Sequence, residues 1–218
     1  MSDTLTLASA HDVADLQTFL QRADRLGCTL TRLTSSGNFL AAIVCVLEKQ
    51  GLLDTHPNVL GMRVVEMAAT DAASQPTVDA LAETRALLDR LARPSALVEL
   101  SFELPVGQPR VPWAGISPPH TEWQLVGTLS SAEFVATART GIDEVAAANG
   151  LGTNIVTEVR RTVWSRPLES MPSVVSGMAF AAFGLGFVVE GDDTSVRITS
   201  NGAWMRATTS RGEVLSRA

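Results

Sequence analysis

One stretch of the sequence gathers residues that could carry out acid–base chemistry. His120 and Glu122 lie close together between Trp113 and Trp123, directly after a stiff Pro-Pro pair. A histidine that a carboxylate orients can act as a general acid or base, and the tryptophans could line a pocket beside it. The alternative is a proline-rich cover whose tryptophans close one end of the core, because adjacent polar residues of one loop need not face each other. The sequence favours the proline-rich cover over the acid–base pair.

A second set of candidate residues lies in the last predicted hairpin. Its strands cover 195–200 and 203–209, and Asn201-Gly202 between them is typical of a two-residue hairpin loop. This loop places Arg197 directly opposite Arg206, which is an unfavourable pair of like charges unless an acid or an anion lies nearby.

Trp204 shares a face with these two arginines, and tryptophan and arginine dominate binding hot spots. One interpretation is a functional patch for an acidic protein or a small anionic ligand. The other is that the acidic loop 190–193 of the same chain supplies the partner, and the sequence favours this second interpretation.

Metal and cofactor sites are not expected. The three histidines, His11, His56 and His120, are widely spaced, so a metal site would need carboxylates assembled by the fold. The sequence holds no Gly-x-Ser-x-Gly, phosphate-binding loop, His-Glu-x-x-His or paired Cys-x-x-Cys motif.

The two cysteines, Cys28 and Cys45, flank a predicted hairpin over 29–34 and 39–47. A turn at Ser36-Gly37 places them opposite each other, and a turn at Gly37-Asn38 staggers them by two positions. We expect two buried thiols that act as small apolar groups, with a redox pair as the less favoured alternative.

Composition excludes several classes of protein. The 218 residues are 45% hydrophobic and 18% charged with a net charge of -6, which disfavours disorder and bulk binding to nucleic acid. Residues 1–149 hold 10 basic and 17 acidic side chains, whereas 150–218 hold 7 and 6. Any anion-facing surface is therefore expected in the C-terminal third.

The sequence favours a cytoplasmic protein. The first residues lack a basic region followed by an apolar core, and the cysteines are too few for a disulfide scaffold. Residues 170–189 are uncharged and long enough to span a bilayer, but they include three serines, one proline and three glycines. We expect a buried helix that runs into a strand there, and no membrane span.

The order of elements predicts an α+β fold with a mostly antiparallel sheet and about five helices. Capping patterns at Ser9 with Asp12 and at Ser130 with Glu133 mark the start of two helices, and Gly27 marks the end of the first. Further elements are expected as strands over 59–67, 98–104 and 123–129, a helix from Pro76 to Arg93, and a helix carrying Ile155, Val159 and Val163.

We expect one compact domain over 1–218, built from two interlocked halves, 1–104 and 120–218. The proline-rich loop 105–119 would join them. Leu26-Gly27 and Leu185-Gly186 each separate a predicted helix from a hairpin, so the halves could repeat a helix–hairpin unit.

Three stretches, 51–63, 113–123 and 160–168, resemble a conserved family of uncharacterised actinobacterial proteins. The likeness covers nearly the whole chain. It implies a cytoplasmic protein and implies no activity, ligand or catalytic residue.

Two hypotheses about function follow. The first is a non-catalytic binding or interaction module, in one version a homodimer, whose binding residues are Trp113, Trp123, Arg197, Trp204 and Arg206. The alternative is a small enzyme with a pocket under the proline-rich loop, in which His120 and Glu122 serve as acid and base.

Overall fold

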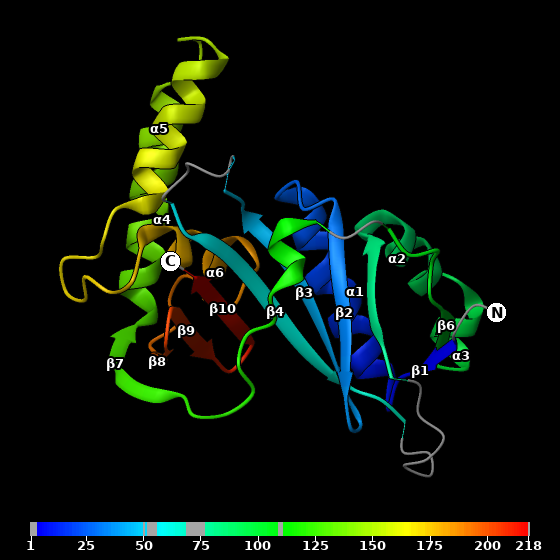
Figure 1. Ribbon diagram of the computed structural model, residues 1–218. Helices are drawn as coiled ribbons and strands as arrows, with labels where there is room; N and C mark the ends of the chain where they lie inside the picture. The colour runs from blue at the N-terminus through cyan, green and yellow to red at the C-terminus, as the bar shows by residue number, and fades with distance from the viewer. Residues whose placement is uncertain (1–3, 50, 52–55, 69–76, 109–110, 218) are drawn as a thin grey trace. The chain divides into compact units, whose positions relative to one another are not determined.

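The computed structural model describes residues 4–49, 51, 56–68, 77–108 and 111–217 (Figure 1). Over these residues it contains six α-helices and ten strands, and the strand pairings whose register is described are antiparallel. The predicted α+β class with a mostly antiparallel sheet is therefore confirmed. The chain divides into two compact units, one of Met1–Val46 with Met62–Ser117 and the other of Leu47–Gly61 with Pro118–Ala218.

The first unit is a sheet accompanied by three helices. Its sheet has the order β5-β2-β3-β4, and β1 pairs with β6 in a separate two-stranded sheet. The elements are β1 (Thr4–Thr6), α1 (Ala10–Arg25), β2 (Leu30–Ser36), β3 (Phe39–Leu47), β4 (Asn58–Glu66), β5 (Asp79–Glu83), α2 (Thr84–Leu91), α3 (Pro94–Val98), β6 (Ser101–Glu103) and a 3-10 turn over Pro112–Gly115. The last residue of β3 and the first four of β4 belong to the second unit.

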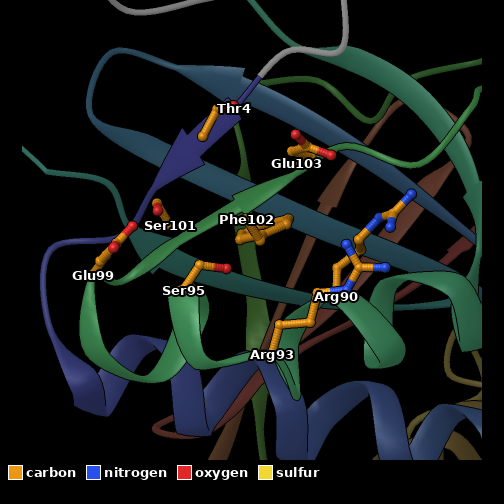
Figure 2. Close-up of a pocket in the computed structure, with 8 residues that line it drawn as sticks. All are labelled: Thr4, Arg90, Arg93, Ser95, Glu99, Ser101, Phe102 and Glu103. Atoms are coloured by element: carbon orange, nitrogen blue, oxygen red, sulfur yellow. The ribbon is translucent and has the colours of Figure 1, made fainter.

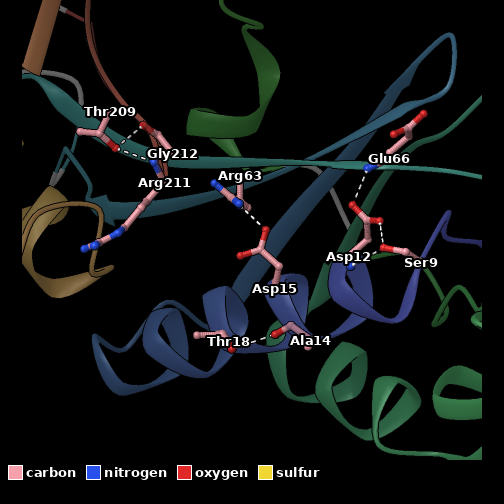
Figure 3. A network of polar contacts seen from close by, with 10 residues as sticks. All are labelled: Ser9, Asp12, Ala14, Asp15, Thr18, Arg63, Glu66, Thr209, Arg211 and Gly212. Atoms are coloured by element: carbon pink, nitrogen blue, oxygen red, sulfur yellow. Dashed lines mark hydrogen bonds and ion pairs between the residues drawn. The ribbon is translucent and has the colours of Figure 1, made fainter.

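The capping pattern predicted for helix α1 is confirmed. The Ser9 hydroxyl accepts a hydrogen bond from the backbone N–H of Asp12, and the Asp12 carboxylate accepts one from the N–H of Glu66 (Figure 3). At the other end Gly27 adopts a φ of 83°, which glycine reaches without a steric penalty. The cap therefore ties the start of α1 to the end of β4.

The helix predicted from Pro76 to Arg93 is wrong in its first half. Pro76 lies outside the described residues, and the segment that follows forms strand β5 before α2 begins at Thr84. Strand β5 pairs with β2, where Thr31 lies opposite Ala82. Pairing with a buried neighbour outweighs the weak helical preference of so short a segment.

The strand predicted over 98–104 is also only partly correct. Pro94 ends α2 as expected, but it then occupies the first turn of α3, a position that its fixed φ suits. The chain leaves α3 through Leu100, whose φ is 58°, and only Ser101–Glu103 pair as a strand.

The second unit is a sheet accompanied by the remaining helices. The strand order is β10-β9-β8-β7, and α4 and α5 run side by side as a helical hairpin (Figure 1). The elements are β7 (Gln124–Ser130), α4 (Ser131–Ala147), α5 (Thr153–Ser165), α6 (Ser176–Gly184), β8 (Ser195–Asn201), β9 (Trp204–Thr209) and β10 (Gly212–Arg217).

The uncharged segment 170–189 contains the buried helix α6. Trp164 of α5 stacks on Phe180 with ring centroids 4.4 Å apart. The strand expected directly after the helix is wrong, because Gly186 turns the chain with a φ of 71° and β8 begins only at Ser195. No helix among the described residues combines the length and apolar character needed to cross a membrane.

The structure decides the register of both predicted hairpins. Ser36 pairs with Phe39, so Gly37-Asn38 forms the loop and the register staggers Cys28 and Cys45. Asn201 pairs with Trp204, so the last loop is Gly202-Ala203 and not Asn201-Gly202.

The predicted pairing of Arg197 with Arg206 is therefore wrong. Arg197 lies opposite Thr208, and Arg206 lies opposite Thr199. The physical reason is the loop itself, in which Gly202 takes the left-handed conformation, with a φ of 55°, at the first loop position.

Candidate binding surface

The candidate residues of the sequence fall into both units. Trp113 belongs to the first unit and is buried, with 6% of its surface exposed. The others belong to the second unit, and four of them lie on or beside one face of its sheet: Trp123, Arg197, Trp204 and Arg206.

Strand pairing arranges this face in rows across the sheet. One row holds Thr128, Arg197, Thr208 and Glu213, and the next holds Leu125, Thr199, Arg206 and Leu215. In the third, Asn201 and Trp204 pair with each other and Trp204 also pairs with Arg217. The opposite face carries buried apolar side chains such as Ile198 and Ala207. Alternation along the strands thus separates a mostly polar face, on which Trp204 and Leu215 are nevertheless buried, from the opposite apolar face.

Arg206 is the centre of the polar face. Its guanidinium lies 4.1 Å from the centroid of the Trp123 ring, its Nε donates to Thr199 Oγ1 at 3.2 Å, and its Nη1 lies 3.7 Å from Glu213 Oε1. The Arg206 side chain is 19% exposed and that of Glu213 is 21% exposed. These contacts hold Arg206 in place from within the unit.

The acidic loop 190–193 does not supply the partner of Arg206. Glu190 pairs with Arg139, and Asp192 lies 3.8 Å from Arg211. The carboxylate beside Arg206 comes from Glu213 of β10, which lies opposite Thr208 in the neighbouring row. The expected acidic partner is thus within the chain but on a different element.

The segment before β7 is hydrogen-bonded to the last hairpin. The Trp123 indole N–H donates to the Pro119 carbonyl at 2.9 Å, and the Asn201 amide donates to the carbonyls of Thr121 (2.9 Å) and Glu122 (3.3 Å). Glu122 adopts a φ of 63°, which is uncommon for a residue with a side chain. Together with the Trp123–Arg206 contact, these bonds fix where β7 begins.

The acid–base pair considered from the sequence lies on the surface. The side chains of His120 and Glu122 are exposed, and no residue that the structure describes forms a hydrogen bond with either side chain. No group of three or more metal-binding side chains occurs in the described parts of the chain.

Two other residues of the polar face differ in their surroundings. Arg197 is exposed, and its side chain has no hydrogen bond or ion pair with any described residue. Trp204 is 7% exposed, and the Arg217 guanidinium lies 5.9 Å from its ring centroid.

Arg166 is paired outside this face. It donates to the Glu144 carboxylate at 2.9 and 3.0 Å, and these bonds lower the pKa of Glu144.

Strand β7 is a surface feature that sequence reasoning missed. It is the last strand in the order of its sheet, and its exposed side chains include Leu125 at 68% and Val126 at 42%. A bulge between Leu125 and Gly127 leaves Val126 without a partner on β8. The signal in the sequence is the lack of any charge from Gln124 to Ser130, but the edge position depends on strand order.

The protein is thus an α+β protein with an exposed edge strand, β7. Hydrogen bonds and the Trp123–Arg206 contact hold the start of this strand against the last hairpin. The chain belongs to the family described as a domain of unknown function (DUF8010), whose model matches residues 1–112. A second model, also described as a domain of unknown function (DUF8185), matches residues 118–218. The expectation of an uncharacterised family is thereby confirmed, and its actinobacterial origin stays a prediction.

Comparison with curated proteins finds no match. Among solved structures, the DNA polymerase sliding clamp from Pseudomonas aeruginosa is 14% identical with a TM-score of 0.47, covering 99% of this chain and 64% of its own. The DnaN sliding clamp from Bartonella birtlesii is 11% identical with a TM-score of 0.49, covering 100% of this chain and 65% of its own. The chain thus spans less than two thirds of the length of these proteins.

Proposed function

We propose that the protein is a non-catalytic interaction module that pairs with a second copy of itself through strand β7. The observation that carries this proposal is an uncharged terminal strand with Leu125 and Val126 exposed. A terminal strand presents unpaired N–H and C=O groups, and proteins usually protect such an edge with charges or proline. Neither occurs from Gln124 to Ser130.

The absence of charge favours a second copy as the partner. In a two-fold antiparallel pairing, the same strand faces itself, so each charge on it would meet a like charge nearby. An uncharged strand avoids this repulsion. Covering Leu125 on both copies would remove apolar surface from water, and full burial of a leucine side chain contributes about 1.5–3 kcal/mol.

The Trp123–Arg206 contact supports the same proposal. Because the Trp123 ring and the Asn201 amide already hold the start of β7, pairing would order few additional groups. A strand that is fixed before association loses less conformational entropy when it binds.

The enzyme hypothesis has less support, because the side chains of His120 and Glu122 are both exposed.

Trp113, Arg197 and Trp204 stay candidates for contact with a further acidic protein or small anionic ligand. Arg197 fits this role best, since it is exposed and unpaired among the described residues. We expect a cytoplasmic protein of actinobacterial origin that does not bind nucleic acid in bulk, given its net charge of -6.

The test is the oligomeric state of a Leu125→Lys variant. Sedimentation velocity over a range of concentrations should show a dimer for the wild type. The variant should have a dissociation constant raised about tenfold or more, because a lysine on the edge must be desolvated or repelled by its counterpart.

Leu151→Lys is the matched control, since Leu151 is 59% exposed and lies between α4 and α5. It should leave the dimer unchanged. A wild type that stays monomeric would contradict the proposal and would indicate that the bulge at Val126 protects the edge. If the Leu125→Lys variant forms a dimer as stable as that of the wild type, the dimer interface does not include Leu125, and the proposal is wrong.

A further inference from the structure

The first unit contains a polar pocket that the proposed dimer does not use. It has a volume of about 290 Å³ and is formed where the end of α2, the helix α3 and the strands β1 and β6 meet (Figure 2). Arg90 and Arg93 line it together with Glu99 and Glu103, and Ser95, Ser101 and Thr4 contribute hydroxyl groups. A volume near 300 Å³ is at the small end of ligand sites in proteins.

The local sequence explains why polar side chains meet there. Leu87 and Leu91 bury one side of α2, which leaves Arg90 in its last turn to face elsewhere, and Arg93 follows directly before Pro94. On the two-stranded sheet, Thr4 pairs with Glu103 and Thr6 with Ser101. Leu5 and Phe102 occupy the alternate, buried positions.

The charges that line the pocket are not paired with each other. None of Arg90, Arg93, Glu99 and Glu103 forms a side-chain ion pair or hydrogen bond with any residue that the structure describes. The Nε–H group of Arg90 is buried and has no acceptor there. A buried donor without an acceptor is uncommon in proteins, but the groups that a ligand in the pocket would reach are the exposed side chains of Arg93, Glu99 and Glu103.

The two kinds of charge restrict the chemistry of that partner. In Figure 2 the two arginines lie together on one side of Phe102, and Glu99 lies on the other side with Ser101. A simple anion would be repelled by the two glutamates, and a simple cation by the two arginines. A ligand with a carboxylate and an ammonium group matches both, since guanidinium binds carboxylate in a bidentate manner and ammonium donates to carboxylates and hydroxyls.

We propose that this pocket binds a small zwitterion with a carboxylate and an ammonium group, of the size of an amino acid or a dipeptide. Arg90 and Arg93 hold its carboxylate. Glu103, which lies on the same side of Phe102 as the arginines in Figure 2, receives its ammonium group, and Glu99 with the hydroxyls of Ser95, Ser101 and Thr4 completes the polar lining.

The test is calorimetric titration of the full chain with each standard L-amino acid and with L-alanyl-L-alanine. At least one of these probes should bind with a dissociation constant in the millimolar range or tighter. Arg93→Gln and Glu103→Gln should each weaken that binding about tenfold or more, and amidating the carboxylate or acetylating the amine of the probe should do the same.

Arg85→Gln is the control, because Arg85 lies on the same helix, is 81% exposed and pairs with Asp24. It should bind the probe as the wild type does. Circular dichroism shows whether each variant folds, and Arg90→Gln and Glu99→Gln replace any variant that does not. The proposal is overturned if no probe binds, if the pocket variants bind unchanged, or if inorganic phosphate binds as tightly as the best zwitterion.

Discussion

The guanidinium of Arg206 shows how one side chain can connect several elements. It contacts Trp123 before β7, Thr199 on β8 and Glu213 on β10. Thr208 also donates to Glu213 at 3.1 Å, so the carboxylate is held from two strands. A charge-assisted network of this kind is stronger and more directional than neutral hydrogen bonds.

Burial makes the Cys28 thiol inert. It is 5% exposed, and burial, with Asp24 nearby, raises its pKa from 9.0 to about 12. Since the thiolate is the reactive form, this thiol is a poor candidate for a redox pair with Cys45. The expectation of a buried thiol that acts as an apolar group fits Cys28, whereas Cys45 is only half-buried.

A first prediction concerns the alkylation of Cys28. In a Cys45→Ala variant at about pH 8, iodoacetamide should modify Cys28 about 1,000-fold more slowly in the folded protein than in urea, because the folded thiolate fraction is that much smaller. Mass spectrometry follows the reaction. Cys28→Ala, which leaves the half-buried Cys45, serves as the comparison and should react faster. Equal rates for Cys28 in the folded and unfolded protein would contradict the burial argument.

At the scale of elements, the close contact between α5 and α6 depends on Gly177. A Cβ atom at this position would lie 2.7 Å from the Trp164 carbonyl oxygen and 2.6 Å from Leu47 Cδ1. The first of these is a backbone atom, which cannot move aside as the end of a flexible side chain could. Glycine is therefore required by the approach of the two helices.

We predict that Gly177→Ala destabilises the protein by about 1–3 kcal/mol, even though alanine favours helices, because the added methyl overfills the contact. Urea unfolding followed by circular dichroism measures the change. Gly115→Ala is the control, since a Cβ there meets nothing within 4 Å. A Gly177→Ala variant as stable as the wild type would show that the helices can separate at no cost.

At the scale of the whole molecule, the two family models and the two compact units divide the chain differently. The models meet between residues 112 and 118, but the second unit also includes Leu47–Gly61. Val59 and Leu60 of that segment are buried, and His56 Nδ1 lies 3.1 Å from Arg161 Nη2. The first matched region thus contributes to the second unit.

This arrangement predicts that residues 118–218 do not form a stable domain alone. Losing two buried aliphatic side chains costs about 3–6 kcal/mol, which is comparable with the whole stability of a small domain. Thermal unfolding of the separate piece should show a much lower midpoint than the full chain, and co-expression with residues 1–117 should restore it. An isolated piece with the midpoint of the full chain would mean that Leu47–Gly61 is dispensable.

The sequence alone determined the features that depend on contacts within a few residues. The caps at Ser9 and Ser130 and the end of α1 at Gly27 are local hydrogen-bonding and backbone preferences, so they could be predicted. The α+β class followed from the order of the elements. The register of the last hairpin could not, since the Asn-Gly signal placed the loop at Asn201-Gly202, one residue before the loop Gly202-Ala203 that forms.

Only the tertiary structure decided which residues act together. The contact of Trp123 with Arg206 and the pairing of Thr4 with Glu103 join segments that are distant in the chain, and the edge position of β7 follows from the order of the strands. Each depends on strand order and register, and a shift of two residues, as in the last hairpin, changes every cross-strand partner. Residue types and spacing therefore predicted the candidate binding residues, and the packing of the strands and helices decided which of them contact each other.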